Sequence, residues 1–276
     1  MLSVNTNSSA MLALQYLTKT NAQISNTETA ISTGLSVATA RDDGATFAIA
    51  QNMRGDVAGC SSIEDSLNRG LSALDVAMSA GQSISDLMIE MKQKALAAAD
   101  SSLDSASRDA LNEDFKALRD QIATVVSNAS FNGLNLLDGS TAQVTALAST
   151  DGSRRIAVSS QSFSFGGSIL GTNFGEYASI GSATGATDMV SIVTKALVRI
   201  DSALSKLSAG AKKYSIQLGF TQKLSDSLST GIGNLVDADM ATESASLTSL
   251  QTKQQLGVQA LSIANSTPQI ILSLFQ

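Results

Sequence analysis

The chain has 276 residues, enough for a sizeable hydrophobic core, and it contains no histidine, no tryptophan, one cysteine and one proline. Without histidine, catalytic Ser-His-Asp and Cys-His sites and histidine-ligated zinc are excluded. The net charge of −6 and the absence of any basic run argue against nucleic-acid binding. One proline and 4% aromatic residues favour long helices packed side by side. We therefore expect a helical protein that is not an enzyme and holds no metal or cofactor.

The first predicted helix lies at the N-terminus. Apolar residues recur every seven positions at Ala10, Leu17, Ile24 and Ile31, and the pattern stops near Gly34. A polar turn follows at residues 39–45, where two aspartates beside an arginine indicate a solvated turn or a contact between subunits.

Two more helices are predicted before the middle of the chain. From Phe47 an apolar register continues without proline and predicts one helix of about 50 residues, or ~75 Å. Interior glycines such as Gly70 and Gly81 weaken this prediction, because each costs up to about 1 kcal/mol in a helix. A third helix should end before Phe131.

The middle of the chain has a different pattern. Asp151-Gly152 separates two short runs of strand type, which is typical of a β-hairpin turn. We expect a small β-rich piece at about residues 140–180.

Helix is predicted again after Thr187-Asp188, which we interpret as an N-cap. Apolar residues then alternate in steps of four and three over about six heptads, a pattern typical of a coiled-coil seam. The seam includes Leu197, Ile200, Leu204, Leu207, Leu218 and Leu228.

The last predicted helix starts at about Asp239 and carries two apolar stripes, so it must contact neighbours on two sides. The acids Asp237, Asp239 and Glu243 could suggest a metal site or a carboxylate pair. We favour the simpler interpretation that they complement the N-terminus of this helix.

The fold class that we predict is mainly α: long antiparallel helices in a coiled-coil bundle with a small β-hairpin insert. Pairing the two terminal helices cannot bury both stripes of the last one. The apolar tail at residues 264–276 therefore requires other copies of the molecule.

Five short motifs, in this order, resemble bacterial flagellin. They are VNTN at 4–7, RDDGA at 41–45, SNASFNGLNLLDG at 127–139, DADMATE at 237–243 and ANSTPQIILSLF at 264–275. The similar regions cover roughly residues 1–139 and 187–276, and the chain is too short for the outer domains of larger flagellins. The resemblance is to a minimal flagellin with only the core domains.

The resemblance implies a structural subunit that polymerises with other flagellin copies, as a homo- or hetero-polymer, into the secreted extracellular filament used for motility. It implies an inner coiled-coil domain at 1–44 plus 237–276 and a rod-like outer domain at 45–236. It further implies unfolded export by the flagellar type III system, an export chaperone, and contacts with the flagellar cap and hook-junction proteins. The start of the chain shows no signal-peptide pattern, which agrees with that route.

Under this interpretation the terminal helices supply the inter-subunit core of the filament. Its predicted members are Leu14, Leu17, Ile24, Ile31, Leu247, Leu250, Leu256, Leu261, Ile263, Ile270, Leu274 and Phe275.

The resemblance also bears on recognition by a host innate receptor. In the flagellins that this receptor senses, the second helix carries a motif resembling QRVRELAVQ, with an arginine and a leucine as anchors. The corresponding stretch here is IEMKQKALA, in which Glu90 replaces the arginine and Lys94 replaces the leucine. We therefore expect a poor agonist.

Two alternatives stay open on the sequence alone. A hook–filament junction protein has similar ends, and a secreted helical translocator or pore-forming protein belongs to another class. The second alternative is disfavoured because no run of about 18 apolar residues exists to insert into a membrane.

Overall fold

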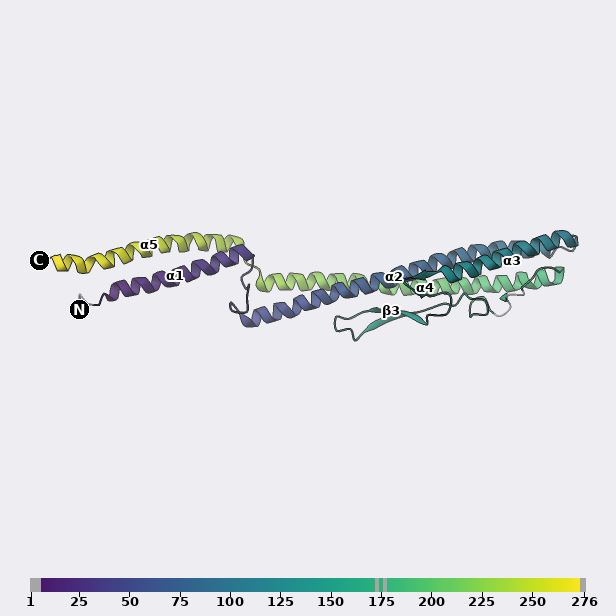
Figure 1. Ribbon diagram of the computed structural model, residues 1–276, viewed down its shortest axis with the longest axis horizontal. Coiled ribbons are helices and arrows are strands. Elements are labelled where there is room, and N and C mark those ends of the chain that lie inside the picture. The colour runs from purple at the N-terminus through teal and green to yellow at the C-terminus, as the bar shows by residue number, and fades with distance from the viewer. Residues whose placement is uncertain (1–5, 172–173, 176–177, 274–276) are drawn as a thin grey trace. The chain divides into compact units, whose positions relative to one another are not determined.

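The computed structural model describes residues 6–171, 174–175 and 178–273, with side chains through residue 266. Within these residues it contains the helices α1 (Ser8–Thr33), α2 (Gly44–Ala98), α3 (Ser105–Asn128), α4 (Ala183–Val236) and α5 (Met240–Ser273). The strands are β1 (Ser130–Phe131), β2 (Leu134–Asn135), β3 (Gln143–Leu147) and β4 (Arg155–Ser159) (Figure 1). The mainly helical fold class with a small β-hairpin is confirmed.

The chain divides into two compact units. Residues 1–57 and 226–276 form what we call the terminal unit, and residues 58–225 form the central unit. The long helices α2 and α4 contribute residues to both.

In the terminal unit, α1 and α5 lie side by side and antiparallel (Figure 1). The Asn7 side-chain amide donates to the Ala264 carbonyl oxygen at 2.8 Å, and the Gln254 amide donates to the Asn21 side-chain oxygen at 2.8 Å. Gly34 ends α1 with φ of 71°, a left-handed C-cap that glycine adopts without steric strain. The predicted end of the first helix is confirmed.

The central unit has its hydrophobic core where α2, α3, α4 and the β3–β4 hairpin meet. Two interior glycines that weakened the prediction of α2 are explained by this packing. A Cβ atom at Gly70 would lie 2.5 Å from the ring of Tyr214, and one at Gly81 would lie 2.7 Å from Leu204. The absence of a side chain at both positions allows α4 to approach α2 closely. The prediction of one long helix is confirmed, since α2 has 55 residues.

The β3–β4 hairpin is antiparallel and pairs Gln143 with Ser159 at its open end. Its predicted turn at Asp151-Gly152 is confirmed, with Gly152 at φ of 72°. The hairpin is attached to α4 through Tyr214, whose buried hydroxyl donates to the Val144 carbonyl oxygen at 2.9 Å.

The predicted start of α4 is wrong. The helix begins at Ala183, because Ser182 is the cap: its hydroxyl oxygen accepts from the Gly185 N–H at 3.1 Å. Thr187 lies inside the first turns, where its hydroxyl donates to the Ala183 carbonyl oxygen. The expectation of a β-rich piece reaching residue 180 is also too broad, since no strand follows Ser159 among the described residues up to α4.

The segment before α4 is held by side chains instead of by a sheet. The buried Asn112 of α3 accepts from the Ile180 N–H at 2.8 Å and from the Ser179 hydroxyl at 2.9 Å. One side-chain oxygen thus satisfies two donors of a loop that forms no ladder.

Candidate assembly surfaces

The α1–α5 pair contains most of the residues predicted to form the inter-subunit core. Ile24 is buried between the helices. The half-buried members are Leu17, Ile31, Leu247, Leu250 and Leu261. Leu14, Leu256 and Ile263 are exposed, and Leu256 retains 60% of its accessible surface. The predicted positions Ile270, Leu274 and Phe275 lie outside the described side chains.

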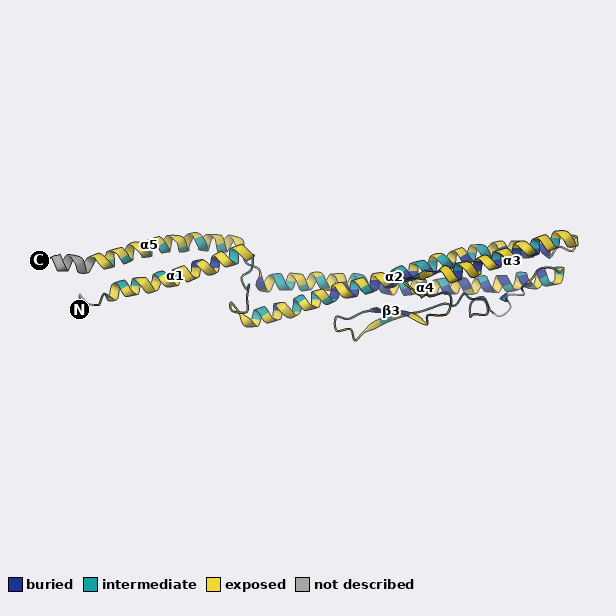
Figure 2. Ribbon diagram, viewed as in Figure 1, coloured by how far each residue is buried: buried dark blue, intermediate teal, exposed yellow. Residues whose placement is uncertain are grey.

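The isolated pair leaves a large amount of apolar surface in contact with water. The pair's exposed large apolar side chains among the described residues are Met11, Leu12, Leu14, Tyr16, Met240, Leu256, Val258 and Ile263. In α1 only Ile24 and Thr27 are buried among the described residues. Figure 2 shows the consequence: α1 and α5 are exposed along most of their described length. Exposed apolar area on this scale marks an interaction surface.

Two equivalent aspartate caps start α2 and α5 in the terminal unit. Asp43 accepts from the Ala45 N–H at 3.0 Å and from the Thr46 hydroxyl at 2.7 Å. Asp239 accepts from the Ala241 N–H at 3.0 Å and from the Thr242 hydroxyl at 2.8 Å. Each aspartate satisfies N–H groups that the helix leaves unpaired.

This geometry supports the interpretation of the acidic cluster as helix-terminal acids. Asp239 is the cap of α5, and Glu243 lies in its first turn. Asp237 instead forms an isolated β-bridge with Leu35. The segment that follows α1 thus pairs with the segment between α4 and α5. Among the described residues, no group of histidine, cysteine or acidic side chains could hold a metal ion.

The caps predict a loss of stability in acid. Hydrogen bonds from Thr46 and Thr242 lower the pKa values of Asp43 and Asp239 below the ordinary value of 3.8. Because the pKa is lower in the folded state, each cap stabilises fully well above pH 3.8, and the stabilisation is lost as the pH falls through the folded value. We expect the double variant Asp43→Asn/Asp239→Asn to lose less helicity than the parent between about pH 5 and pH 2, measured by circular dichroism. Equal losses would contradict the prediction.

The residues predicted to form the seam of α4 differ in how deeply they are buried. Ile200 and Leu207 are fully buried in the core of the central unit. Leu197, Leu204 and Leu218 are half-buried against that core. Leu228 is half-buried and belongs to the terminal unit.

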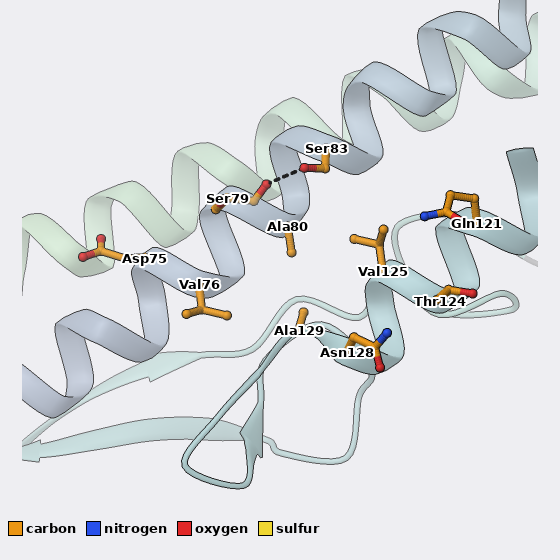
Figure 3. A pocket seen from close by; sticks show the side chains of 10 residues that line it. All are labelled: Asp75, Val76, Ser79, Ala80, Ser83, Gln121, Thr124, Val125, Asn128 and Ala129. Carbon is orange, nitrogen blue, oxygen red and sulfur yellow. Dashed lines mark hydrogen bonds between the residues drawn. The ribbon is translucent and has the colours of Figure 1, made fainter.

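A groove between α2 and α3 was not predicted from the sequence. It has a volume of about 560 Å³, and its lining residues are Asp75, Val76, Ser79, Ala80, Ser83, Gln121, Thr124, Val125, Asn128 and Ala129. Figure 3 shows Val76 and Ala80 of α2 facing Val125 of α3 and Ala129, the residue directly after α3. The signal that could have found it is the cluster of small residues at positions 79, 80 and 83.

The residues that depart from the receptor motif lie on the outer surface of α2. Glu90 is exposed. Lys94 forms an ion pair with Asp114 of α3, with the Nζ and Oδ2 atoms 2.6 Å apart. Hydrogen bonding to Asp114 raises the pKa of the Lys94 ammonium.

Together, the long helices and the exposed terminal pair define a structural subunit that assembles with copies of its own kind. Comparison with known proteins supplies the family. The bacterial flagellin N-terminal helical region matches residues 4–142, and the bacterial flagellin C-terminal helical region matches residues 190–275. The chain belongs to the bacterial flagellin family, whose members are the structural subunits of the extracellular flagellar filament.

Full-length relatives agree with this assignment. The chain is 47% identical to flagellin FljK of Caulobacter vibrioides over 99% of this chain and 98% of that one. It is 37% identical to a flagellin of Brucella melitensis biotype 1 over the whole of both chains. The match extends through the central segment, where the sequence alone suggested no resemblance.

Solved structures share the fold. A flagellar hook-associated protein from Vibrio parahaemolyticus aligns with a TM-score of 0.59 at 13% identity, covering 71% of this chain and all of that one. Bacillus cereus flagellin aligns with a TM-score of 0.50 at 17% identity, covering 56% of this chain and 88% of that one. Full-length identity to flagellins decides against the junction protein that the sequence left open. Within the described residues, no helix is long and apolar enough to cross a bilayer.

Proposed function

We propose that this flagellin polymerises through its terminal helix pair. Residues 1–44 and 237–276 would form the inner domain of the filament, and residues 45–236 would form the outer domain. The observation that carries the proposal is the exposed apolar surface of α1 and α5, which neighbouring copies would cover.

Energetics support the proposal. Ordering the backbone costs about 1–2 kcal/mol per residue, and a helix offsets that cost chiefly by burying apolar side chains. Because α1 has 26 residues and buries only Ile24 and Thr27 among those described, the pair by itself recovers little of the cost. Contacts with other copies would supply the remainder, so the ends fold stably only in the filament.

Export and partners follow from the family and form part of the proposal. The chain would pass unfolded through the flagellar type III system. A single cysteine cannot form an intramolecular disulfide, and the chain has only one proline, so its composition agrees with export in an unfolded state. An export chaperone would cover the apolar tail in the cell, and the cap and hook-junction proteins would contact the ends of the filament. Caulobacter vibrioides has several flagellins similar to this chain, which supports a hetero-polymer with sister subunits. No feature of the described residues suggests catalysis.

Limited trypsin digestion tests the proposal. The exposed cleavage sites Lys19, Arg41 and Lys253 lie toward the ends of the chain. In the monomer we expect rapid cleavage at these sites, because no neighbouring copy covers the terminal unit. In filaments the same sites should be protected, while a heat-dissociated filament serves as the control. Resistance of both ends in a verified monomer would contradict the proposal.

Receptor recognition provides an independent prediction. Loss of an anchoring arginine and of an anchoring leucine each costs about 2 kcal/mol or more at typical interfaces, so Glu90 and Lys94 should together weaken binding about a thousandfold. A reporter assay with purified monomer should therefore show little activation. The variant Glu90→Arg/Lys94→Leu should restore part of the response, with Glu113→Arg as a surface control. Strong activation by the parent would refute the prediction.

A further inference from the structure

The central unit carries an exposed apolar ridge on α4. Ile216 and Phe220 retain 64% and 59% of their accessible surface, and they lie one helical turn apart. The exposed lysines Lys212, Lys213 and Lys223 flank them, and none of the three forms an ion pair with a described residue. We call Ile216 and Phe220 the α4 ridge.

The α2–α3 groove offers this ridge four apolar side chains and one negative charge within an otherwise polar lining. Its facing side chains are small and apolar, namely those of Val76, Ala80, Val125 and Ala129 (Figure 3). Of the described residues that line it, only Asp75 is charged, and Asp75 forms no ion pair within the described part of the chain. A bulky, basic ridge and a small-residue, acidic groove can pack as ridges into grooves.

The two surfaces lie on opposite sides of the central unit. Tyr214 faces Gly70 of α2 and Leu218 packs against the core, so the ridge residues, about half a helical turn away, face outward from α4. Gly70 and Gly81 of α2 face α4, whereas the exposed groove residues Ser79 and Ser83 lie about half a helical turn from Gly81. Ridge and groove therefore cannot meet within one molecule.

We propose that the α4 ridge of one copy docks into the α2–α3 groove of the neighbouring copy in the filament. This inference rests on the proposed polymerisation and names a contact for it outside the terminal helices. Since the contact joins two different surfaces, it is heterologous, and its repetition produces an open array instead of a closed dimer.

The register of the helices sets the stagger between parallel copies. Tyr214 lies opposite Gly70, which places the ridge beside residues 64–68 of its own α2. The groove is centred near Ser79, about 13 residues further along, so neighbours should be shifted by ~20 Å. The same shift brings Lys223 of one copy level with Asp75 of the neighbouring copy. The shift that places the ridge in the groove therefore also brings the positive Lys223 close to the negative Asp75 of the neighbouring copy.

Assembly of the full chain tests the ridge. Phe220→Ser should raise the critical concentration for seeded polymerisation about tenfold or more, because a central aromatic anchor is lost. Val198→Ser is the matched control, because Val198 is 65% exposed on the same outer face of α4 but lies away from the ridge. The Val198→Ser protein should assemble like the parent. Both monomers should keep the parent's circular dichroism spectrum.

Charge reversal tests the register. Asp75→Lys should raise the critical concentration roughly fivefold, because it places two ammonium groups together. Adding Lys223→Glu in the same chain should restore assembly, whereas adding Lys195→Glu should not. Rescue by Lys195→Glu, or by neither change, would place the contact elsewhere.

Cross-linking in filaments tests geometry directly. Ile216→Cys combined with Ser83→Cys should form a ladder of covalent oligomers under mild oxidation, whereas either single variant and the pair Val198→Cys/Ser83→Cys should stay monomeric. Cys60 is buried in every variant and provides the common background. If the parent forms no filaments, the proposed function itself fails. If the parent assembles while Phe220→Ser polymerises equally well and no ladder forms, only this contact is overturned.

Discussion

Removal of residues 264–276 is expected to abolish filament assembly completely while leaving the central unit folded. The core of that unit is built by α2, α3, α4 and the hairpin, and among the residues whose side chains are described none of its members comes from α5. We therefore expect the central unit to fold without the tail. In the proposed filament it contributes apolar side chains to contacts between copies, which no other part of the chain replaces.

Electron microscopy and sedimentation of the truncated protein would provide the measurement, with circular dichroism reporting on folding. A point variant of α5 outside the tail tests the exposed apolar surface of that helix: Leu256→Ser should weaken assembly, whereas Gln255→Ser, at the neighbouring exposed position, should not. Filaments of normal length from the truncated chain would refute the role assigned to the tail.

The second large effect is expected in the central unit. Leu207→Asp should lower the free energy of unfolding by about 4 kcal/mol or more, because it creates a cavity and buries a carboxylate without a partner. Leu207 is fully buried in the shared core of the helices and hairpin. A loss of this size is a large part of the stability of an ordinary domain, so the variant should be partly unfolded and poorly assembled.

Urea denaturation followed by circular dichroism would measure the loss. Leu204→Asp should cost less, because Leu204 is only half-buried where it packs over Gly81. Val198→Asp, on the exposed face of the same helix, should change stability by no more than about 0.5 kcal/mol. A Leu207→Asp protein as stable as the Val198→Asp control would show that the seam is assigned to the wrong face of α4.

Most of the helices, and the family, could be predicted from the sequence alone. Heptad spacing is a local property, so Leu17, Ile24 and Ile31 indicated α1 without knowledge of its neighbour, and the absence of proline allowed α2 to be read as one helix. The turn at Asp151-Gly152 was equally local, since the chemistry of two residues specifies it. The terminal motifs that resemble flagellin also required no structure.

Which surfaces are covered and which stay open depended on three-dimensional packing. The start of α4 depended on the Ser182 hydroxyl, which accepts a hydrogen bond from the Gly185 N–H. The loop before α4 depended on Asn112, whose side-chain oxygen accepts a hydrogen bond from the Ile180 N–H, 68 residues away in the sequence. The α2 glycines looked costly until Tyr214 and Leu204 were seen to occupy their space. The α4 ridge and the α2–α3 groove likewise became recognisable only after packing had used the other faces of those helices. Periodicity identifies an apolar face, but burial depends on residues distant in sequence, so only three-dimensional packing shows which apolar side chains remain for a partner.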